Sequence, residues 1–176
     1  CPPGEAALAK ARKLRPGSGS LVAEEVDVAG RRDAVTRTVG RARVAFRDVT
    51  RATDSRTVRA CLVPPEHFLL NSAPYLAFVD DNSNAVSACL GVMSSLVFDW
   101  QARRFVETHM NFFVLEGLRL PPLDDQTFAA LATASARLSC IDDRFSKFAE
   151  ETGVECGPLD DDERERLRVD IDALVA

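Results

Sequence analysis

The stretch from residue 85 to residue 105 constrains the fold most, because its large apolar side chains recur at the spacing of one helix face. These positions are Val86, Cys89, Leu90, Met93, Leu96, Val97 and Trp100. Small residues stand between them, which permits close packing of a helix on a sheet, and residues 80–84 supply candidate caps at its start. Asp99 and Arg103 lie one helical turn apart and are expected to pair. The stretch therefore predicts one long apolar helix that covers a sheet.

Short β-like runs occur on both sides of this helix. Residues 44–49 and 57–63 favour strands, and residues 68–70, 75–79 and 111–115 have the same character. A second long helix is predicted over residues 124–151, capped by Asp124 and stopped by Gly153, and a third begins in the acidic run 160–163. The pattern predicts an α+β fold: a small mixed β-sheet packed on a long apolar helix, followed by a C-terminal helical pair.

The chain divides by composition into three parts. Residues 1–40 form a basic N-terminal segment, broken by proline, glycine and serine at 16–20, for which partial order is expected. Residues 41–123 would form the α+β core, and residues 124–176 a helical C-terminal segment. The chain starts at Cys1 without a methionine, and its last residues read as an uncapped helix. We therefore expect it to be a piece of a longer protein.

Charge is distributed unevenly along the chain, whose formal net charge is −5. Residues 1–59 contain thirteen Lys and Arg against seven Asp and Glu, a net of +6. Residues 60–176 contain nine against twenty, a net of −11, and the stretch 43–60 alone has five arginines and two acids. This asymmetry indicates a polyanion-facing part beside a solvated acidic part, although a basic tail next to an acidic domain would have the same composition.

The residue types of the arginine-rich stretch suit a nucleic-acid surface. Guanidinium groups bind phosphate bidentately and read guanine, hydroxyl and amide groups donate to phosphates or base edges, and Asp54 would accept from cytosine. After the long helix, Arg103, Arg104 and His109 form a second candidate face. The candidate DNA-binding residues are Arg43, Arg47, Arg51, Thr53, Asp54, Arg56, Arg59, Asn71, Arg103, Arg104 and His109.

A structural role for the same arginines is the competing interpretation. Arg47, Arg56 and Arg59 would then pair with Asp48, Asp54 or later acids and hold the strands together. Composition alone does not separate the two roles.

The sequence offers no catalytic centre. A metal-dependent nuclease needs an acid two residues before a lysine, and Lys10, Lys13 and Lys147 all lack one. His67 and His109 have no ligand-spaced partners, so we expect neither a metal nor a cofactor in this chain. The five cysteines without CxxC spacing fit a reduced cytoplasmic setting. No apolar run reaches the ~18 residues that a membrane span needs.

Two stretches carry a resemblance to a known family. The stretch "VMSSLVFDWQARRFVETHMNFFVLEGLRLPPLDDQTFAALA" resembles the end of a target recognition domain in restriction–modification proteins. That family has an apolar helix with a Leu-Asn-Ser-like turn, a loop, an Asn-Phe strand, a proline-ended strand and an Asp/Glu-Gln helix start. The matching elements here are Met93-Ser94-Ser95, with Ser94 in place of the family's Asn, Asn111-Phe112-Phe113, Leu120-Pro121-Pro122-Leu123 and Asp125-Gln126. The stretch "FRDVTRATDSRTVRACLVPP" resembles the preceding segment in fused type IIG and related adenine-methylase enzymes.

The resemblance covers about residues 43–176 and implies a C-terminal DNA-reading module that is not itself an enzyme. Such a module would follow an adenine-N6 methyltransferase domain, and often a nuclease or helicase part, in the parent protein. The implied partners are double-stranded DNA and that upstream domain, with no membrane. S-adenosylmethionine, and Mg²⁺ where a nuclease is fused, would belong to the parent. The alternative is a protein-interaction or scaffold domain that docks methylase or nuclease subunits, which the negative net charge favours.

Overall fold

The computed structural model describes residues 38–78 and 82–176. In chain order the elements are β1 (Arg43–Phe46), β2 (Ala60–Val63), α4 (Ser83–Ser94), α5 (Leu96–Ala102), α6 (Phe112–Gly117), α7 (Asp125–Ser139), the 3-10 helix η1 (Asp143–Phe145), α8 (Ser146–Thr152) and α9 (Asp161–Val175). The basic segment 1–40, for which partial order is predicted, lies outside the described residues except for its last three.

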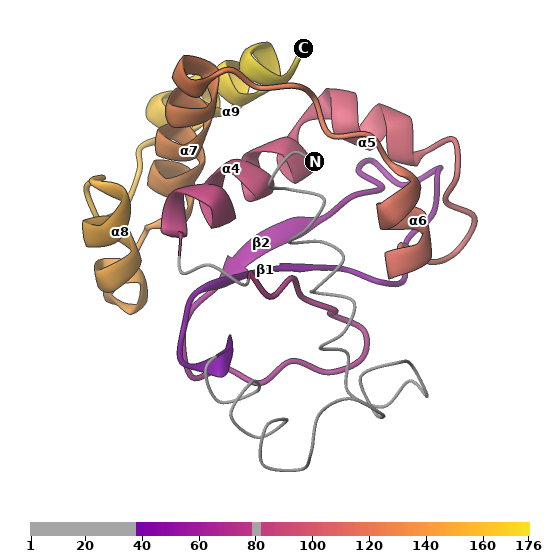
Figure 1. The fold of residues 1–176 in the computed structure, drawn as a ribbon, viewed down its shortest axis with the longest axis horizontal. Helices are drawn as coiled ribbons and strands as arrows, with labels where there is room; N and C mark the ends of the chain where they lie inside the picture. Colours follow the sequence, from indigo (N-terminus) through magenta and orange to yellow (C-terminus); the bar gives the residue numbers. More distant parts are fainter. Residues whose placement is uncertain (1–37, 79–81) are drawn as a thin grey trace.

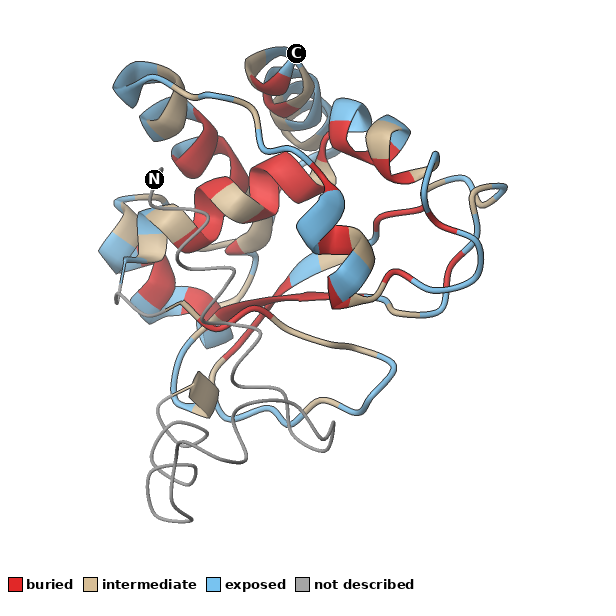
Figure 2. Cartoon of the chain, turned by 45° about the vertical axis from the view of Figure 1, so that its right-hand side comes forward, coloured by how far each residue is buried: buried red, intermediate tan, exposed pale blue. Residues whose placement is uncertain are grey.

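Helix α4 forms the middle layer of the fold (Figure 1). On one side it packs against β1 and β2, and on the other side against α7, which in turn contacts α9. Buried residues gather along α4 and the strands, while the outer sides of the helices are exposed (Figure 2). This arrangement confirms the predicted α+β fold, with an apolar helix on a small sheet and a helical pair after it. In the described residues the sheet is two-stranded and antiparallel rather than mixed, with Arg43 opposite Val63.

Two small residues of α4, Ser87 and Gly91, face α7, not the sheet as the sequence suggested. The hydroxyl of Ser87 donates to the carbonyl of Ala132 at 2.6 Å. A Cβ atom on Gly91 would lie only 2.7 Å from Cδ1 of Leu131. At Gly91 the two helices therefore lie so close together that a larger side chain has no room.

The predicted single helix over residues 85–105 is wrong, because the chain breaks at Ser95 and α5 leaves at 64° to α4. Ser95 has an extended backbone, and its hydroxyl accepts from the amide of Phe98 at 3.2 Å, which caps α5. The amide of Leu96 donates to the carboxylate of Asp172 in α9 at 2.6 Å. Serine is a strong N-cap, and this tertiary bond satisfies an amide that the break leaves free.

The predicted strand over residues 111–115 is a helix, α6. The side chain of Asn111 accepts from the amide of Val114 at 3.0 Å and so acts as its N-cap. Phe112 then packs edge-on against Phe46 of β1, with ring centroids 5.5 Å apart. Capping and this aromatic contact outweigh the β propensity of the Phe-Phe-Val run.

The two further strands predicted within residues 68–79 are reduced to an irregular segment in the described residues. Only an isolated bridge between Ala45 and Tyr75 remains. Pro74 has no amide hydrogen to donate, although its carbonyl accepts from the amide of Phe46 at 2.9 Å.

The long helix predicted over residues 124–151 ends at Ser139. Asp124 caps α7 by accepting from the amide of Thr127 at 2.7 Å, as predicted, and this bond lowers the pKa of Asp124. Asp142 accepts from the amide of Arg144 and starts η1, and α8 follows. Gly153 stops α8 with a φ of 70°, also as predicted.

Two cysteines belong to the helical core. Cys89 packs against it and Cys140 is fully buried, as the sequence predicts. Burial raises the pKa of the Cys89 thiol to about 12 and that of Cys140 to about 11, because desolvation disfavours the thiolate. No single helix in the described ranges is both long and apolar enough to cross a membrane. Only the bent pair of α4 and α5 meets those two criteria together.

Candidate nucleic-acid interface

The arginine-rich stretch is built around one extended segment, residues 43–50. Beyond β1 its backbone continues to pair on both edges. On one edge, the amide of Arg47 donates to the carbonyl of Arg59 at 2.9 Å. On the other edge, Asp48 joins two segments: its amide donates to Ser72 at 3.0 Å, and its carbonyl accepts from Met110 at 2.7 Å. Three chain segments that are distant in sequence therefore meet beside Asp48.

Residues 43–46 are all buried, and from Phe46 to Arg51 the side chains alternate between the core and solvent, as in a strand. Phe46 and Thr50 are buried and point inward. Arg47, Val49 and Arg51 are exposed and point outward. The alternation gives the segment an outer face with two guanidinium groups separated by one exposed valine.

A third guanidinium joins them across the sheet. The register of β1 and β2 pairs Phe46 with Ala60, and one further step sets Arg47 opposite Arg59. Both side chains are exposed. Within residues 38–78 and 82–176, the salt bridges include none to Arg47, Arg51 or Arg59. Like charges directly opposite each other destabilise a sheet unless an anion compensates them. We call Arg47, Arg51 and Arg59 the arginine face.

The loop between Thr50 and Val58 is anchored by side chains of α5 and its C-cap, Asp99 and Arg103. The buried carboxylate of Asp99 accepts from the amides of Thr57 and Val58, both at 2.7 Å, and pairs with Nε of Arg103 at 2.8 Å. The pairing of Asp99 with Arg103 confirms the expectation from their spacing.

Arg103 extends this anchor into the loop itself. Its guanidinium donates to three loop carbonyls, those of Ala52, Asp54 and Ser55, each at 2.8 Å. Arg103 was expected to face DNA, and in the structure it instead fixes the loop that carries Arg51 and Thr53. The spacing of Asp99 and Arg103 in the sequence predicts their pairing. It does not predict the loop groups that they bind, which lie more than forty residues away in the chain.

Two more candidate arginines turn inward, toward backbone carbonyl groups of the fold. Arg43 is 3% exposed, donates to the carbonyl of His67 and lies over the ring of Tyr75, 4.9 Å from its centroid. Burial lowers the pKa of Arg43, and Tyr75 opposes that shift. Arg56 is half-buried and donates to the carbonyl of Ser94 at 2.7 Å, at the C-terminal end of α4. A cation there stabilises the helix end.

The inward-facing arginines therefore bind backbone carbonyl groups, and not Asp48 or Asp54. Asp48 has His109 as its partner, with 3.1 Å between the ring nitrogen and the carboxylate. Asp54 is half-buried in the loop turn, where its amide donates to Arg51. Nε of Arg59 donates to the carbonyl of Arg56 at 3.2 Å, although the side chain remains exposed.

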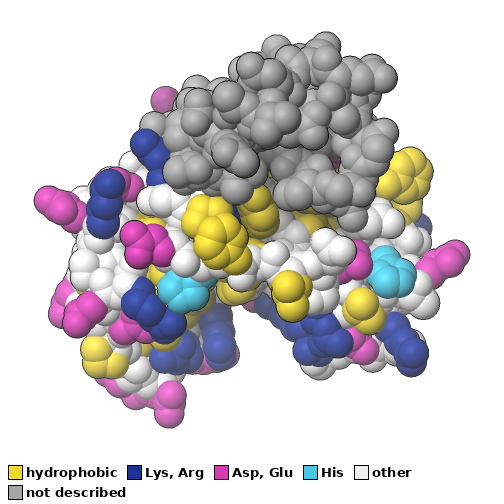
Figure 3. Space-filling model, turned by 90° about the horizontal axis from the view of Figure 1, so that it is seen from below, with side chains coloured by type: hydrophobic (Ala, Val, Ile, Leu, Met, Phe, Trp, Pro, Cys, Tyr) yellow, Lys and Arg dark blue, Asp and Glu magenta, His cyan; other side chains and the backbone are white. Residues whose placement is uncertain are grey.

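The remaining candidates are exposed but not all in one place. Asn71 lies in a turn whose neighbour Ser72 pairs with Asp48, and His109 pairs through a bridge with Val49, so both flank the extended segment. Thr53 lies at the exposed tip of the loop. Arg104 stacks over Trp100, 5.3 Å from the ring centroid, on the solvent side of α5. Seen from below, basic, acidic and exposed hydrophobic side chains all lie around the two histidines (Figure 3).

Several large apolar side chains that lie in the predicted strands prove to be exposed. Phe68 and Leu70 are 81% and 82% exposed, and Phe113 is 80% exposed. Their sequence signal was misleading, because short apolar runs read as buried strands. In the described part of the chain, no three His, Cys, Asp or Glu side chains are grouped so that they could hold a metal ion.

Comparison of the chain with protein-family models, with curated proteins and with solved structures found no match.

Proposed function

We propose that this chain is the DNA target recognition module of a restriction–modification enzyme and binds duplex DNA without catalysing a reaction itself. The parent enzyme would be a cytoplasmic adenine-N6 DNA methyltransferase, with an endonuclease fused in some forms, and would supply S-adenosylmethionine and any Mg²⁺. The sequence resemblance motivates this assignment.

The observation that carries the proposal is the pairing of Arg47 with Arg59 across the sheet. Two exposed guanidiniums opposite each other repel, so the arrangement gains stability when an anion lies over both. A DNA backbone presents phosphates in that way, and guanidinium binds them bidentately. Arg51 continues the row, on a loop that Asp99 and Arg103 keep in place.

Charge reversal of the opposed pair tests the proposal. We expect the chain to bind duplex DNA weakly, with an affinity that falls steeply as salt rises. Arg47→Glu with Arg59→Glu should weaken binding roughly 30-fold at low salt and reduce the salt slope by about two, because two phosphate contacts are lost. Fluorescence anisotropy with a labelled duplex measures both quantities. In the parent enzyme the same variant should lose methylation while remaining folded.

The matched control reverses two exposed arginines of α9, Arg166 and Arg168, which changes the net charge equally. That variant should bind DNA within about twofold of the wild type, since only long-range repulsion increases. Equal losses in the two variants would mean that net charge, and not the arginine face, governs binding, and the proposal would then fail.

A scaffold function is the second candidate, favoured by the apolar solvent side of α5. Leu96, Val97 and Trp100 are 57%, 41% and 62% exposed there. Exposed apolar groups of this size on one short helix suit contact with another protein. Exchange of residues 43–120 with those of a related enzyme separates the candidates. A recognition module predicts that the methylated sequence changes, whereas a scaffold predicts an unchanged sequence.

A further inference from the structure

His109 lies directly opposite Val49, the exposed valine that separates two residues of the arginine face. Two backbone hydrogen bonds, of 3.1 Å and 2.7 Å, join residues 108–110 to residues 48–50 and enclose this antiparallel bridge. Residues directly opposite each other in an antiparallel pair project from the same face of the sheet. The exposed side chain of His109 therefore projects from the same outer face as Val49.

This position brings His109 close to two guanidinium groups. Val49 stands between Arg47 and Arg51 along the segment, so both arginines are diagonal neighbours of His109. Diagonal neighbours on one face of a sheet lie about 7–8 Å apart, within reach of long side chains. An anion that lies over these guanidiniums is therefore also within reach of the imidazole ring.

The carboxylate of Asp48 orients that ring. Nδ1 of His109 lies 3.1 Å from Oδ2 of Asp48, and the imidazole side chain is 52% exposed. In this pairing Nδ1 donates, which leaves Nε2 to meet a ligand. In the neutral ring Nε2 then only accepts a hydrogen bond, whereas in the protonated ring it donates one. A phosphodiester oxygen also only accepts, so Nε2 bonds to a DNA phosphate when the ring is protonated.

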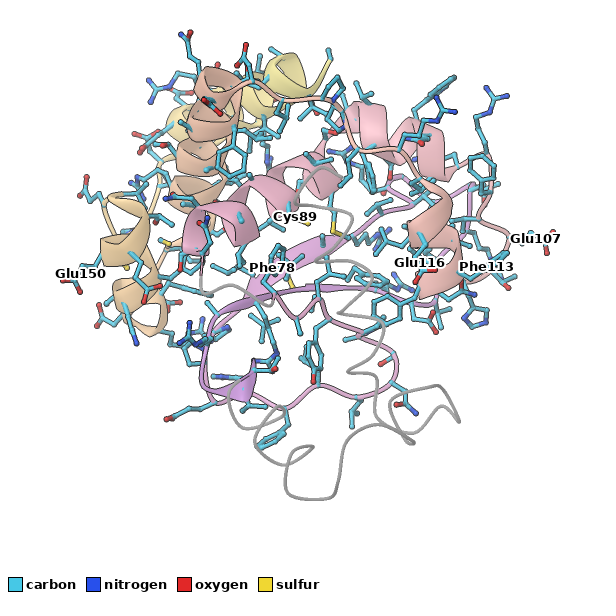
Figure 4. All side chains as sticks on the ribbon, viewed as in Figure 1. Phe78, Cys89, Glu107, Phe113, Glu116 and Glu150 are labelled. Carbon is cyan, nitrogen blue, oxygen red and sulfur yellow. The ribbon has the colours of Figure 1, made fainter. Side chains whose placement is uncertain are left out.

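The other charged groups around His109 belong to types that keep their charge near neutral pH. Arginine lies on the strand side, as described above, and Asp48 pairs with the ring itself. Glu107 extends from the edge of the molecule, and Glu116 of α6 lies on the same side (Figure 4). The turn 70–73, which also pairs with Asp48, has no ionisable side chain. Among these residue types, histidine is the one whose charge changes between pH 5 and 8.

We propose that His109 couples DNA binding at the arginine face to the uptake of one proton. This inference rests on the proposed function and adds regulation by pH to it. A phosphate over the arginines brings negative charge to Nε2, which favours the protonated ring, and Nε2–H then donates to a phosphate oxygen. The proton comes from solvent as the complex forms and returns to solvent on release. Because the coupling is reciprocal, the affinity for DNA rises as the pH falls.

Binding of a labelled duplex at pH 7.5 and pH 6, followed by fluorescence anisotropy at one low salt concentration, tests the coupling. We expect the affinity of the wild-type chain to rise roughly fivefold over this interval. His109→Gln should lose the rise and bind at pH 6 roughly fivefold more weakly than the wild type, because glutamine takes up no proton. Calorimetry in buffers of different ionisation enthalpy should show proton uptake by the wild-type complex and none by the variant.

His67→Gln is the matched control, because the chain has two histidines and His67 pairs with the carbonyl of Pro65 instead. It should keep the full rise, and circular dichroism should show both variants folded at both pH values. Equal wild-type affinity at the two pH values, or a rise that persists in His109→Gln, would overturn the coupling while leaving DNA binding intact. Absence of binding at either pH in low salt would instead overturn the proposed function, and the coupling with it.

Discussion

Replacement of Asp99 by alanine should destabilise the fold more than any other single change at the candidate interface, by about 4 kcal/mol. Asp99 is 3% exposed, and its carboxylate satisfies the amides of Thr57 and Val58 as well as Nε of Arg103. Alanine leaves these donors without an acceptor in a place that water reaches poorly, so their desolvation is not repaid. Urea unfolding followed by circular dichroism measures the loss.

The same variant should release the loop that carries Arg51. Amide hydrogen exchange at Thr57 and Val58 should accelerate well beyond the global change in stability, because both amides lose their direct acceptor. Asp99→Asn is the matched control, since it keeps the shape and one acceptor oxygen, and it should cost about half as much. Wild-type protection of those two amides in Asp99→Ala would contradict the anchoring role.

Replacement of Gly91 by valine should cost about 3 kcal/mol, the second largest effect. A Cβ atom there would lie 2.7 Å and 2.9 Å from two atoms of the Leu131 side chain and 3.3 Å from Cβ of Ser135. Leu131 is fully buried, so any shift of its side chain disturbs its packed neighbours. The α4–α7 crossing must therefore open, which also disturbs the packing of α4 on the sheet. Thermal unfolding of the variant measures the loss.

Gly117→Ala provides the comparison for this second change. A Cβ at Gly117 meets nothing within 4 Å, so alanine there should alter stability by less than about 1 kcal/mol. If Gly91→Val were as well tolerated as Gly117→Ala, the close approach of α4 and α7 would not be a constraint on the fold.

Substitutions in the arginine face and at Asp99 should affect DNA binding and stability differently. The exposed Arg47 and Arg59 support few contacts of the fold, so their reversal should lower affinity with little change in unfolding. Asp99 supports the loop from within, so its loss should lower both. A pattern of this kind distinguishes residues that touch DNA from residues that position them.

The sequence by itself determined those features whose cause is local. The cap at Asp124, the left-handed stop at Gly153 and the pairing of Asp99 with Arg103 depend on residues within a few positions of each other. The apolar character of α4 and the two paired strands were also predictable, because periodicity and propensity report directly on burial. The α+β class followed from these parts.

The tertiary structure decided what depends on groups far away in the chain. The break at Ser95 is completed by Asp172, and the helix at Asn111 by the contact of Phe112 with Phe46. The tertiary structure also decides which arginines are buried and which are exposed. The composition shows how many arginines the chain has. The positions of backbone carbonyls that lack another partner decide which arginine side chains turn inward. Arg43, Arg56 and Arg103 found such carbonyls, while the outer face of a paired strand left Arg47, Arg51 and Arg59 in solvent.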